Sequence, residues 1–151
     1  MAKFMTARGT IDPDSTSLGK TAQVRLFSGD FAKGYRITRF VIFQSDPDNT
    51  SNDVYGILLT ENLYDGTDAV FDAADNRQIG WAGQVAVYNE GTMPGFELLD
   101  RDNYIVEDLW IYVRTGTTTS PVNYYIEMEK ETRGLTKGAV AMVRNSSQGR
   151  D

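Results

Sequence analysis

The chain has 151 residues, 40% of them hydrophobic and 24% charged, with 21 acidic against 15 basic side chains and with no cysteine and no histidine. These counts exclude a disulfide framework, a thiol nucleophile, an imidazole base and a structural zinc site built from the usual nitrogen and sulfur ligands. A chain of this length is typical of one domain, and it can bury enough apolar surface to fold without a covalent or metal staple.

No stretch approaches the roughly 20 apolar residues of a membrane span, and the first residues lack the apolar run of a signal peptide. An aromatic content of 11% and a net charge of only -6 also argue against disorder. We therefore expect a soluble protein that is made in the cytoplasm and has no membrane partner.

The charges are unevenly distributed along the chain. Residues 1–45 hold seven basic and three acidic side chains, residues 46–110 two basic and fourteen acidic, and residues 111–151 six basic and four acidic. Acidic loops that cluster in the middle third explain this pattern without any partner. Alternatively, the ends and the middle face outward on different sides and attract each other between neighbouring copies. The basic residues are singly spaced on an acidic chain, so direct nucleic-acid binding is not expected.

Alternating or β-branched runs that end at turn residues predict strands along most of the chain. Residues 1–20 are expected to form an extended N-terminal arm, and residues 145–151 a polar C-terminal tail. The predicted strands are 22–27, 35–44, 54–60, 78–87, 96–99, 104–113, 122–130 and 139–143. Glycines within 78–87 indicate bulges or the close approach of another segment. The last strand is alternatively one helical turn, because Ala and Met favour helix.

The two most regular predicted strands have clear face assignments. In 122–130, one face carries Val122, Tyr124, Ile126 and Met128, and the other carries Asn123, Tyr125, Glu127 and Glu129. In 104–113, both faces are apolar or aromatic, so both are expected to be covered. The connection between them is rich in Gly, Thr, Ser and Pro, which predicts that the two strands pair as an antiparallel hairpin.

About eight strands and no convincing amphipathic helix predict an all-β protein, an antiparallel β-sandwich. A jelly roll is the favoured architecture because eight strands in two sheets is its usual size, and an immunoglobulin-like sandwich is the alternative. Residues 21–144 are predicted to form this single domain.

Acidic residues are candidates for metal ligands and for catalytic carboxylates. The segment Asp46–Asp53 is rich in the oxygen ligands that Ca²⁺ takes, but it lacks the glycine and the final glutamate of an EF-hand loop, so an Asx-rich turn is the simpler interpretation. Asp100–Asn103 is predicted to be a turn before the strand at Tyr104. Glu127 and Glu129 share a strand face, as a glycosidase carboxylate pair would, but alternation already explains them as solvated residues. We therefore predict no enzyme activity and assign no catalytic, cofactor-binding or metal-ligating residue.

Aromatic side chains provide the other candidate site. Rings on the exposed side of strands can stack on sugars, and the candidates are Tyr125, Trp81, Trp110, Tyr88 and Tyr112. Packing in the core or between subunits is the simpler interpretation for the two tryptophans. The triplets at Asn49 and Asn145 match the glycosylation pattern, but no secretory signal supports their use.

Several stretches resemble small virion-associated proteins predicted from marine phage and environmental viral sequences. The resemblance spans residues 20–149 and rests on Ser28–Phe31, Ile37–Phe40, Asp75–Ala82, Asn103–Leu109, Asn123–Glu129 and Gly138–Gly149. It implies a non-enzymatic structural protein of a bacteriophage or related virus particle, with a jelly-roll-like fold and a place in the virion.

The expected function is therefore that of a capsid subunit, or of a decoration protein that cements a shell built by another protein. Its partners would be copies of itself, as a homo-oligomer, or other capsid subunits, contacted through arm, tail and loops by many weak contacts. The few basic residues in 1–20 favour the decorating role. A lectin-like carbohydrate-binding module is the alternative, and a carboxylate-dependent glycosidase is a third hypothesis.

Overall fold

The computed structural model describes residues 3–13, 19–26, 29, 32–46, 52–64, 69–85, 95–116 and 120–132. Within them the regular elements are all strands, which confirms the predicted all-β class. The strands are β1 (Lys3–Ile11), β2 (Gly19–Val24), β3 (Lys33–Gln44), β4 (Val54–Leu59), β5 (Gln78–Gln84), β6 (Gly95–Leu99), β7 (Leu109–Thr115) and β8 (Val122–Thr132). The predicted strand 139–143 and the tail 145–151 lie outside the described residues.

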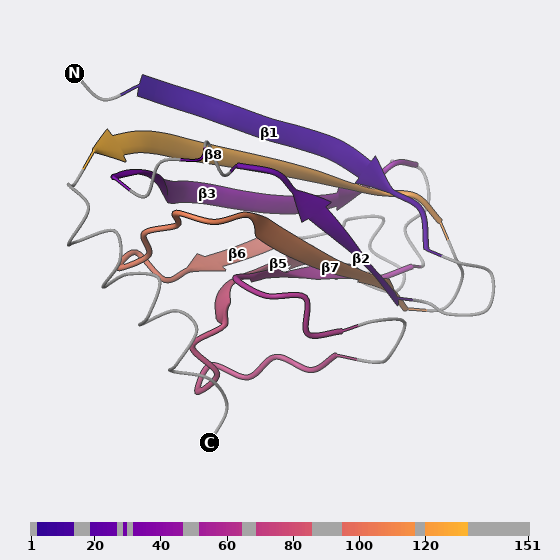
Figure 1. The fold of residues 1–151 in the computed structure, drawn as a ribbon. Coiled ribbons are helices and arrows are strands. Elements are labelled where there is room, and N and C mark those ends of the chain that lie inside the picture. The colour runs from indigo at the N-terminus through magenta and orange to yellow at the C-terminus, as the bar shows by residue number, and fades with distance from the viewer. Residues whose placement is uncertain are drawn as a thin grey trace.

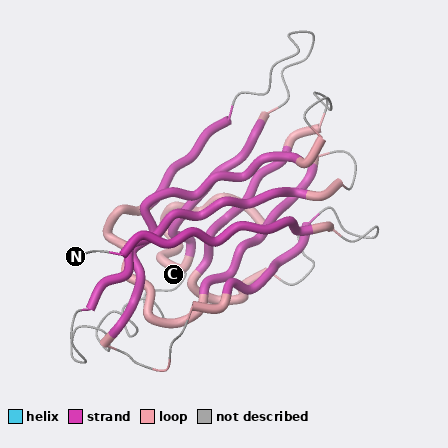
Figure 2. The backbone as a smooth tube through the Cα atoms, turned by 90° about the horizontal axis from the view of Figure 1, so that it is seen from above, coloured by secondary structure: helices cyan, strands magenta, loops and turns pink. Residues whose placement is uncertain are grey.

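The strands form two antiparallel sheets that pack face to face (Figure 1). Sheet A has the order β1-β8-β3, and sheet B has the order β2-β7-β4-β5-β6. Seen from above, the strands run along the long axis of the molecule (Figure 2). The predicted β-sandwich is confirmed.

The strand order has part of the topology of a jelly roll. A rolled-up ribbon of eight strands has the nested neighbours 1–8, 2–7, 3–6 and 4–5, and here β1–β8, β2–β7 and β4–β5 are paired. The remaining pair is not formed, because β6 pairs with β5 instead of β3. The jelly roll therefore stays a prediction. The order also differs from that of an immunoglobulin domain, whose first two strands share a sheet, since β1 and β2 lie in different sheets.

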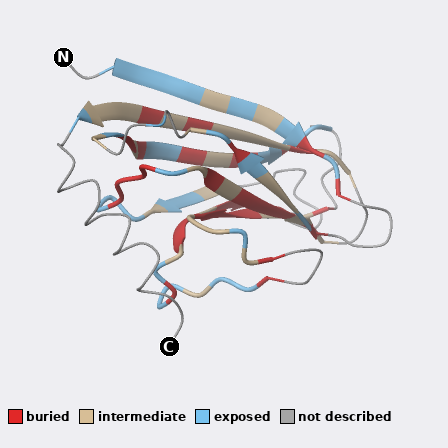
Figure 3. Cartoon of the chain, viewed as in Figure 1, coloured by how far each residue is buried: buried red, intermediate tan, exposed pale blue. Residues whose placement is uncertain are grey.

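The main core fills the space between the two sheets, and along much of β8 its buried residues alternate with less buried, outward-facing ones (Figure 3). From β8 it takes Val122, Ile126 and Met128, each at most 1% exposed, with Tyr124 packed against them. The predicted inner face of 122–130 is thereby confirmed. Its opposite face is half-buried rather than fully solvated, because β8 is the central strand of sheet A.

Residues 3–11 form a strand of sheet A, within the segment 1–20 that the sequence predicts to be an extended N-terminal arm. β1 pairs with β8 from Lys3 opposite Lys130 to Ile11 opposite Val122, and β2 already begins at Gly19. The sequence pattern is weak because β1 is an edge strand that buries only Ile11 fully and leaves its first four side chains exposed (Figure 3).

The predicted hairpin of 104–113 with 122–130 is wrong, because β7 belongs to sheet B and β8 to sheet A. The predicted strand 104–113 is also divided between the sheets. Ile105 forms an isolated bridge with Tyr35 of sheet A, and β7 starts only at Leu109. A turn-rich connection looks the same in sequence whether it joins neighbours in one sheet or crosses between two sheets.

The glycines of β5 mark close approach of other segments, as predicted. A Cβ atom at Gly80 would lie 3.2 Å from Leu58, Leu99 and Phe40. The register between β4 and β5 also shifts between Leu58 and Leu59, which is a bulge.

Candidate functional site

A second apolar layer covers the outer face of sheet B. The connection from β4 to β5, residues 60–77, lies over this face in its described parts, 60–64 and 69–77 (Figure 1). The layer is made of Ile57, Leu59, Tyr64, Ala69 and Tyr112, with Leu63, Trp81 and Trp110 packed against it. Because Tyr112 is buried here while Ile111 is buried in the main core, both faces of β7 are covered, as the sequence predicted.

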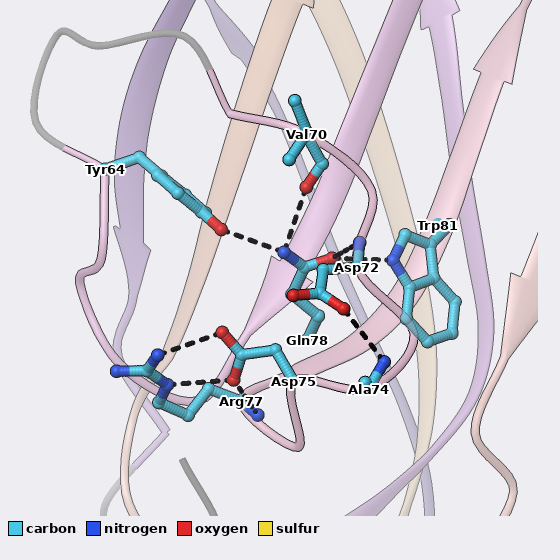
Figure 4. Close-up of polar contacts among 8 residues, drawn as sticks. All are labelled: Tyr64, Val70, Asp72, Ala74, Asp75, Arg77, Gln78 and Trp81. Atoms are coloured by element: carbon cyan, nitrogen blue, oxygen red, sulfur yellow. Dashed lines mark hydrogen bonds and ion pairs between the residues drawn. The ribbon is translucent and has the colours of Figure 1, made fainter. Parts of the chain in front are cut away.

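Gln78 holds this connection in place through all four hydrogen-bonding positions of its side-chain amide (Figure 4). Its Nε2 donates to Tyr64 Oη at 2.8 Å and to the Val70 carbonyl at 3.1 Å. Its Oε1 accepts from Trp81 Nε1 at 2.8 Å and from the Asp72 amide at 2.9 Å. A buried amide satisfied in this way specifies one geometry, because every alternative leaves polar atoms without partners. No pattern in the sequence singles out Gln78.

Asp75 and Arg77 close the same connection with a two-pronged ion pair (Figure 4). Arg77 donates from Nε and from a terminal nitrogen to the two carboxylate oxygens of Asp75, each at 2.9 Å. The Arg77 amide also donates to Asp75 Oδ1 at 3.0 Å. The side-chain hydrogen bonds to Asp75 raise the pKa of Arg77, so the guanidinium stays charged. The pair tightens the turn before β5 and offers no group for chemistry.

Apolar side chains beside this network stay open to solvent and form a surface that we call the apolar patch. It consists of the exposed side chains of Val70, Phe71 and Leu98 and of the half-buried Phe96, which Phe71 contacts. Leu98 is 64% exposed, Val70 65% and Phe71 48%. The ring of Phe71 meets Phe96 of β6 and Tyr55 of β4 edge to face, at centroid distances of 6.2 and 6.0 Å. Phe71 is therefore packed against two neighbouring rings while about half of its surface stays exposed.

Three of the aromatic candidates for sugar stacking, Trp81, Trp110 and Tyr112, take part in the second apolar layer on sheet B. Trp81 donates its indole N–H to Gln78, and Trp110 packs in the second apolar layer. Tyr112 is 1% exposed. Tyr88 lies outside the described residues. The carbohydrate alternative stays a prediction that a glycan array would test.

Glu127 and Glu129 lie on the outer face of sheet A, as the alternation predicted. They are separated by one residue on the same strand, and neither lines the two surface hollows of about 330 and 260 Å³ that lie between β3 and β6. Glu127 accepts a hydrogen bond from Tyr125 Oη at 3.0 Å, which orients its carboxylate along the sheet. Arg39 of β3 is the register partner of Glu127. This arrangement is a cross-strand polar surface of the kind that stabilises sheets.

The Tyr125–Glu127 contact makes a prediction about titration. The hydrogen bond to Glu127 raises the pKa of Tyr125 above its ordinary value of 10.0. Because the folded state favours the neutral phenol, the stabilisation is complete below pH 10 and is lost as the pH rises through the raised pKa. We expect Glu127→Gln to lower the pKa of Tyr125, measured from the pH dependence of its ring carbon chemical shifts. The matched control Glu129→Gln, on the same strand face, is expected to leave that pKa nearly unchanged. An equal effect of both variants would contradict the assignment.

The acidic segments act as turns where they are described. In Asp100–Asn103 the Asp102 amide donates to Asp100 Oδ1 at 3.0 Å, which confirms the predicted turn. Residues 47–51 of the candidate calcium segment, which include Asn49, lie outside the described residues. Asn145 lies outside them as well. In the described part of the chain, no three acidic side chains converge on one point as metal ligands would.

Comparison with protein families, curated proteins and solved structures finds no match to this chain. The described residues contain no helix that is long and apolar enough to cross a membrane. Inference about function therefore depends on the sequence and on the surfaces described above.

Proposed function

We propose that this protein is a non-enzymatic structural subunit of a virus particle, either a capsid subunit or a decorating and cementing subunit, that binds copies of itself or other shell proteins. The observation that carries the proposal is the apolar patch, because exposed apolar clusters framed by polar residues are typical of protein interfaces. The resemblance to virion-associated proteins supports the placement in a virus particle.

The edges of the sheets support assembly as well. β1 is one edge of sheet A, and it carries the exposed side chains Phe4 and Met5. An edge strand presents unpaired main-chain groups that can pair with another chain. An edge strand that exposes Phe4 and Met5 suits a protein whose copies meet in an ordered array.

The apolar patch gives a direct test of assembly. We expect Leu98→Asp to weaken self-association at least about tenfold, because a charge would be buried against apolar surface. Size-exclusion chromatography with light scattering over a concentration series measures this. The control Asn62→Asp adds the same charge at an exposed residue of the β4–β5 connection, outside the patch. Unchanged association of Leu98→Asp contradicts the role of the patch, and a wild-type chain that stays monomeric at high concentration contradicts self-assembly.

Deletion of residues 1–20 is not a clean test of the expected arm. It would remove all of β1, which pairs along its length with β8, together with the first residues of β2. Single substitutions on exposed side chains separate assembly from folding better.

A further inference from the structure

The strand β1 forms one long edge of sheet A. The sheet has the order β1-β8-β3, and in Figure 1 no labelled strand lies beyond β1. β1 pairs with β8 without a register shift from Lys3 to Ile11, and it contains no proline. Bulges and prolines are two of the usual devices that block an edge. The main-chain groups of β1 that face away from β8 therefore have no strand partner in the described part of the chain.

The freest part of this edge is residues 3–9. The side chains of residues 3–6 are all exposed, and Phe4 is 75% exposed (Figure 3). Further along the strand the chain turns into the sandwich, since Ile11 is 4% exposed and Pro13 is buried. A partner strand can therefore approach residues 3–9 more easily than the end that leads to β2.

The sequence of β1 suits antiparallel pairing with itself. When a two-fold axis perpendicular to the sheet relates two copies, opposite residues share a face, so the axis passes beside one residue of each copy. Thr6 is the middle of residues 3–9. The register centred on Thr6 has three distinct pairs between the copies, Lys3 with Gly9, Phe4 with Arg8, and Met5 with Ala7. Like charges do not face each other in any of these pairs, so the basic side chains do not block this register.

We propose that β1 pairs with β1 of a second copy across a two-fold axis at Thr6, which joins the A sheets of the two copies into one continuous sheet. Main-chain hydrogen bonds to an exposed sheet edge are the usual basis of strand addition. A two-fold contact closes on itself, so growth beyond a dimer needs a second surface, and the apolar patch provides one. The inference deepens the proposed self-assembly and rests on it.

The charges on the outer face of sheet A favour a second copy as the partner. Phe4 lies opposite Glu129 of its own chain. Arg36 is the register partner of Glu129 on β3, but its Nε lies 3.1 Å from Glu131 Oε1. The proposed register brings Arg8 of the second copy to the free side of Phe4. There the guanidinium can stack on the exposed ring, and its charge is complementary to that of Glu129 across the ring. The two-fold axis forms this contact twice.

The absence of cysteine allows a direct test by disulfide cross-linking. In the proposed dimer, the cysteines of full-length Thr6→Cys lie directly opposite each other, with Cα atoms about 4.5–5.5 Å apart, which suits a disulfide. The matched control Thr10→Cys is exposed on the same strand face, but its two cysteines would lie about 27 Å apart along the strands. Under mild oxidation, we expect Thr6→Cys to form the disulfide dimer at an initial rate at least about fivefold higher. Equal rates overturn the proposal.

A charge placed at the two-fold axis gives a second measurement. Thr6→Lys brings two like charges opposite each other in the dimer, whereas within one chain it faces Glu127 and so keeps a favourable cross-strand pair. We expect it to weaken self-association at least about tenfold by light scattering, and Thr10→Lys to leave it unchanged. If Thr6→Lys weakens association but Thr6→Cys cross-links no faster than its control, β1 meets another part of the second copy and the two-fold pairing is overturned.

Light scattering on the wild type and on Leu98→Asp separates this inference from the proposed function. If the wild type associates and Leu98→Asp weakens the association, but neither Thr6 variant differs from its control, the pairing of β1 fails and the proposed function stands. If the Thr6 variants behave as expected and Leu98→Asp has no effect, the pairing stands and the role of the apolar patch fails. A wild type that stays monomeric at high concentration overturns both self-assembly and the pairing.

Discussion

Replacing Phe40 with alanine is expected to lower the free energy of unfolding by about 3–5 kcal/mol, the usual cost of deleting a fully buried phenylalanine ring. Phe40 is 1% exposed and lies in β3 between the two sheets. Its ring also borders Gly80, where an added Cβ would stand only 3.2 Å away. Because the neighbouring atoms are already closely packed, we expect them to move too little to fill the cavity that removal of the ring would leave. Urea denaturation followed by tryptophan fluorescence measures the change.

Phe4→Ala is the matched control for this prediction. Phe4 is 75% exposed on the edge strand β1, so its removal is expected to change the free energy of unfolding by less than about 0.5 kcal/mol. A cost below about 1 kcal/mol for Phe40→Ala, or equal costs for both variants, would mean that the two sheets do not pack as described.

Gln78→Met is expected to destabilise the fold by about 2–4 kcal/mol, although methionine has nearly the same size and is apolar. The substitution leaves Trp81 Nε1, Tyr64 Oη and the Asp72 amide without the partner they have in the native structure. Leaving a buried polar group unsatisfied costs about 1–3 kcal/mol. We expect the tryptophan emission to shift to longer wavelength as well, because Trp81 loses the bond that holds it beneath the connection.

The exposed glutamine Gln23 provides the control for the second prediction. It also makes a side-chain hydrogen bond, donating from Nε2 to Asp108 Oδ2 at 2.8 Å, but at an exposed site. Gln23→Met is expected to cost less than about 0.5 kcal/mol, because water replaces the lost partner. If Gln78→Met behaves like Gln23→Met, the connection is not held by the amide network.

The prediction for Gln78 also bears on assembly through the apolar patch. Phe71 and Val70 belong to the connection that Gln78 holds, since the Val70 carbonyl accepts from the glutamine amide. Loosening that network is therefore expected to disorder Val70 and Phe71 of the apolar patch before the main core unfolds. Such a variant would lose self-association at a lower denaturant concentration than it loses its sheets.

The sequence predicted the outer and inner faces of β8 well, because a strand in a two-layer sandwich repeats every second residue. Val122, Ile126 and Met128 are buried, and the glutamates face outward. The sequence did not reveal β1, because that strand borders the sandwich and only Ile11 is fully buried in it. It also did not reveal Gln78, because a lone glutamine carries no pattern. Its importance arises from Tyr64, Val70 and Trp81, which approach it only in the folded chain.

By itself, the sequence determined the all-β class, the position of most strands and the absence of cysteine and histidine chemistry. These properties depend on residue types and on local alternation, which are present in the chain before it folds. Only the tertiary structure decided that β7 and β8 lie in different sheets, that the described parts of the β4–β5 connection cover sheet B, and that β6 pairs with β5 and not with β3. Pairing between strands depends on contacts far apart in the sequence, and a bulge at Ile37 and Arg39 is enough to redirect an edge.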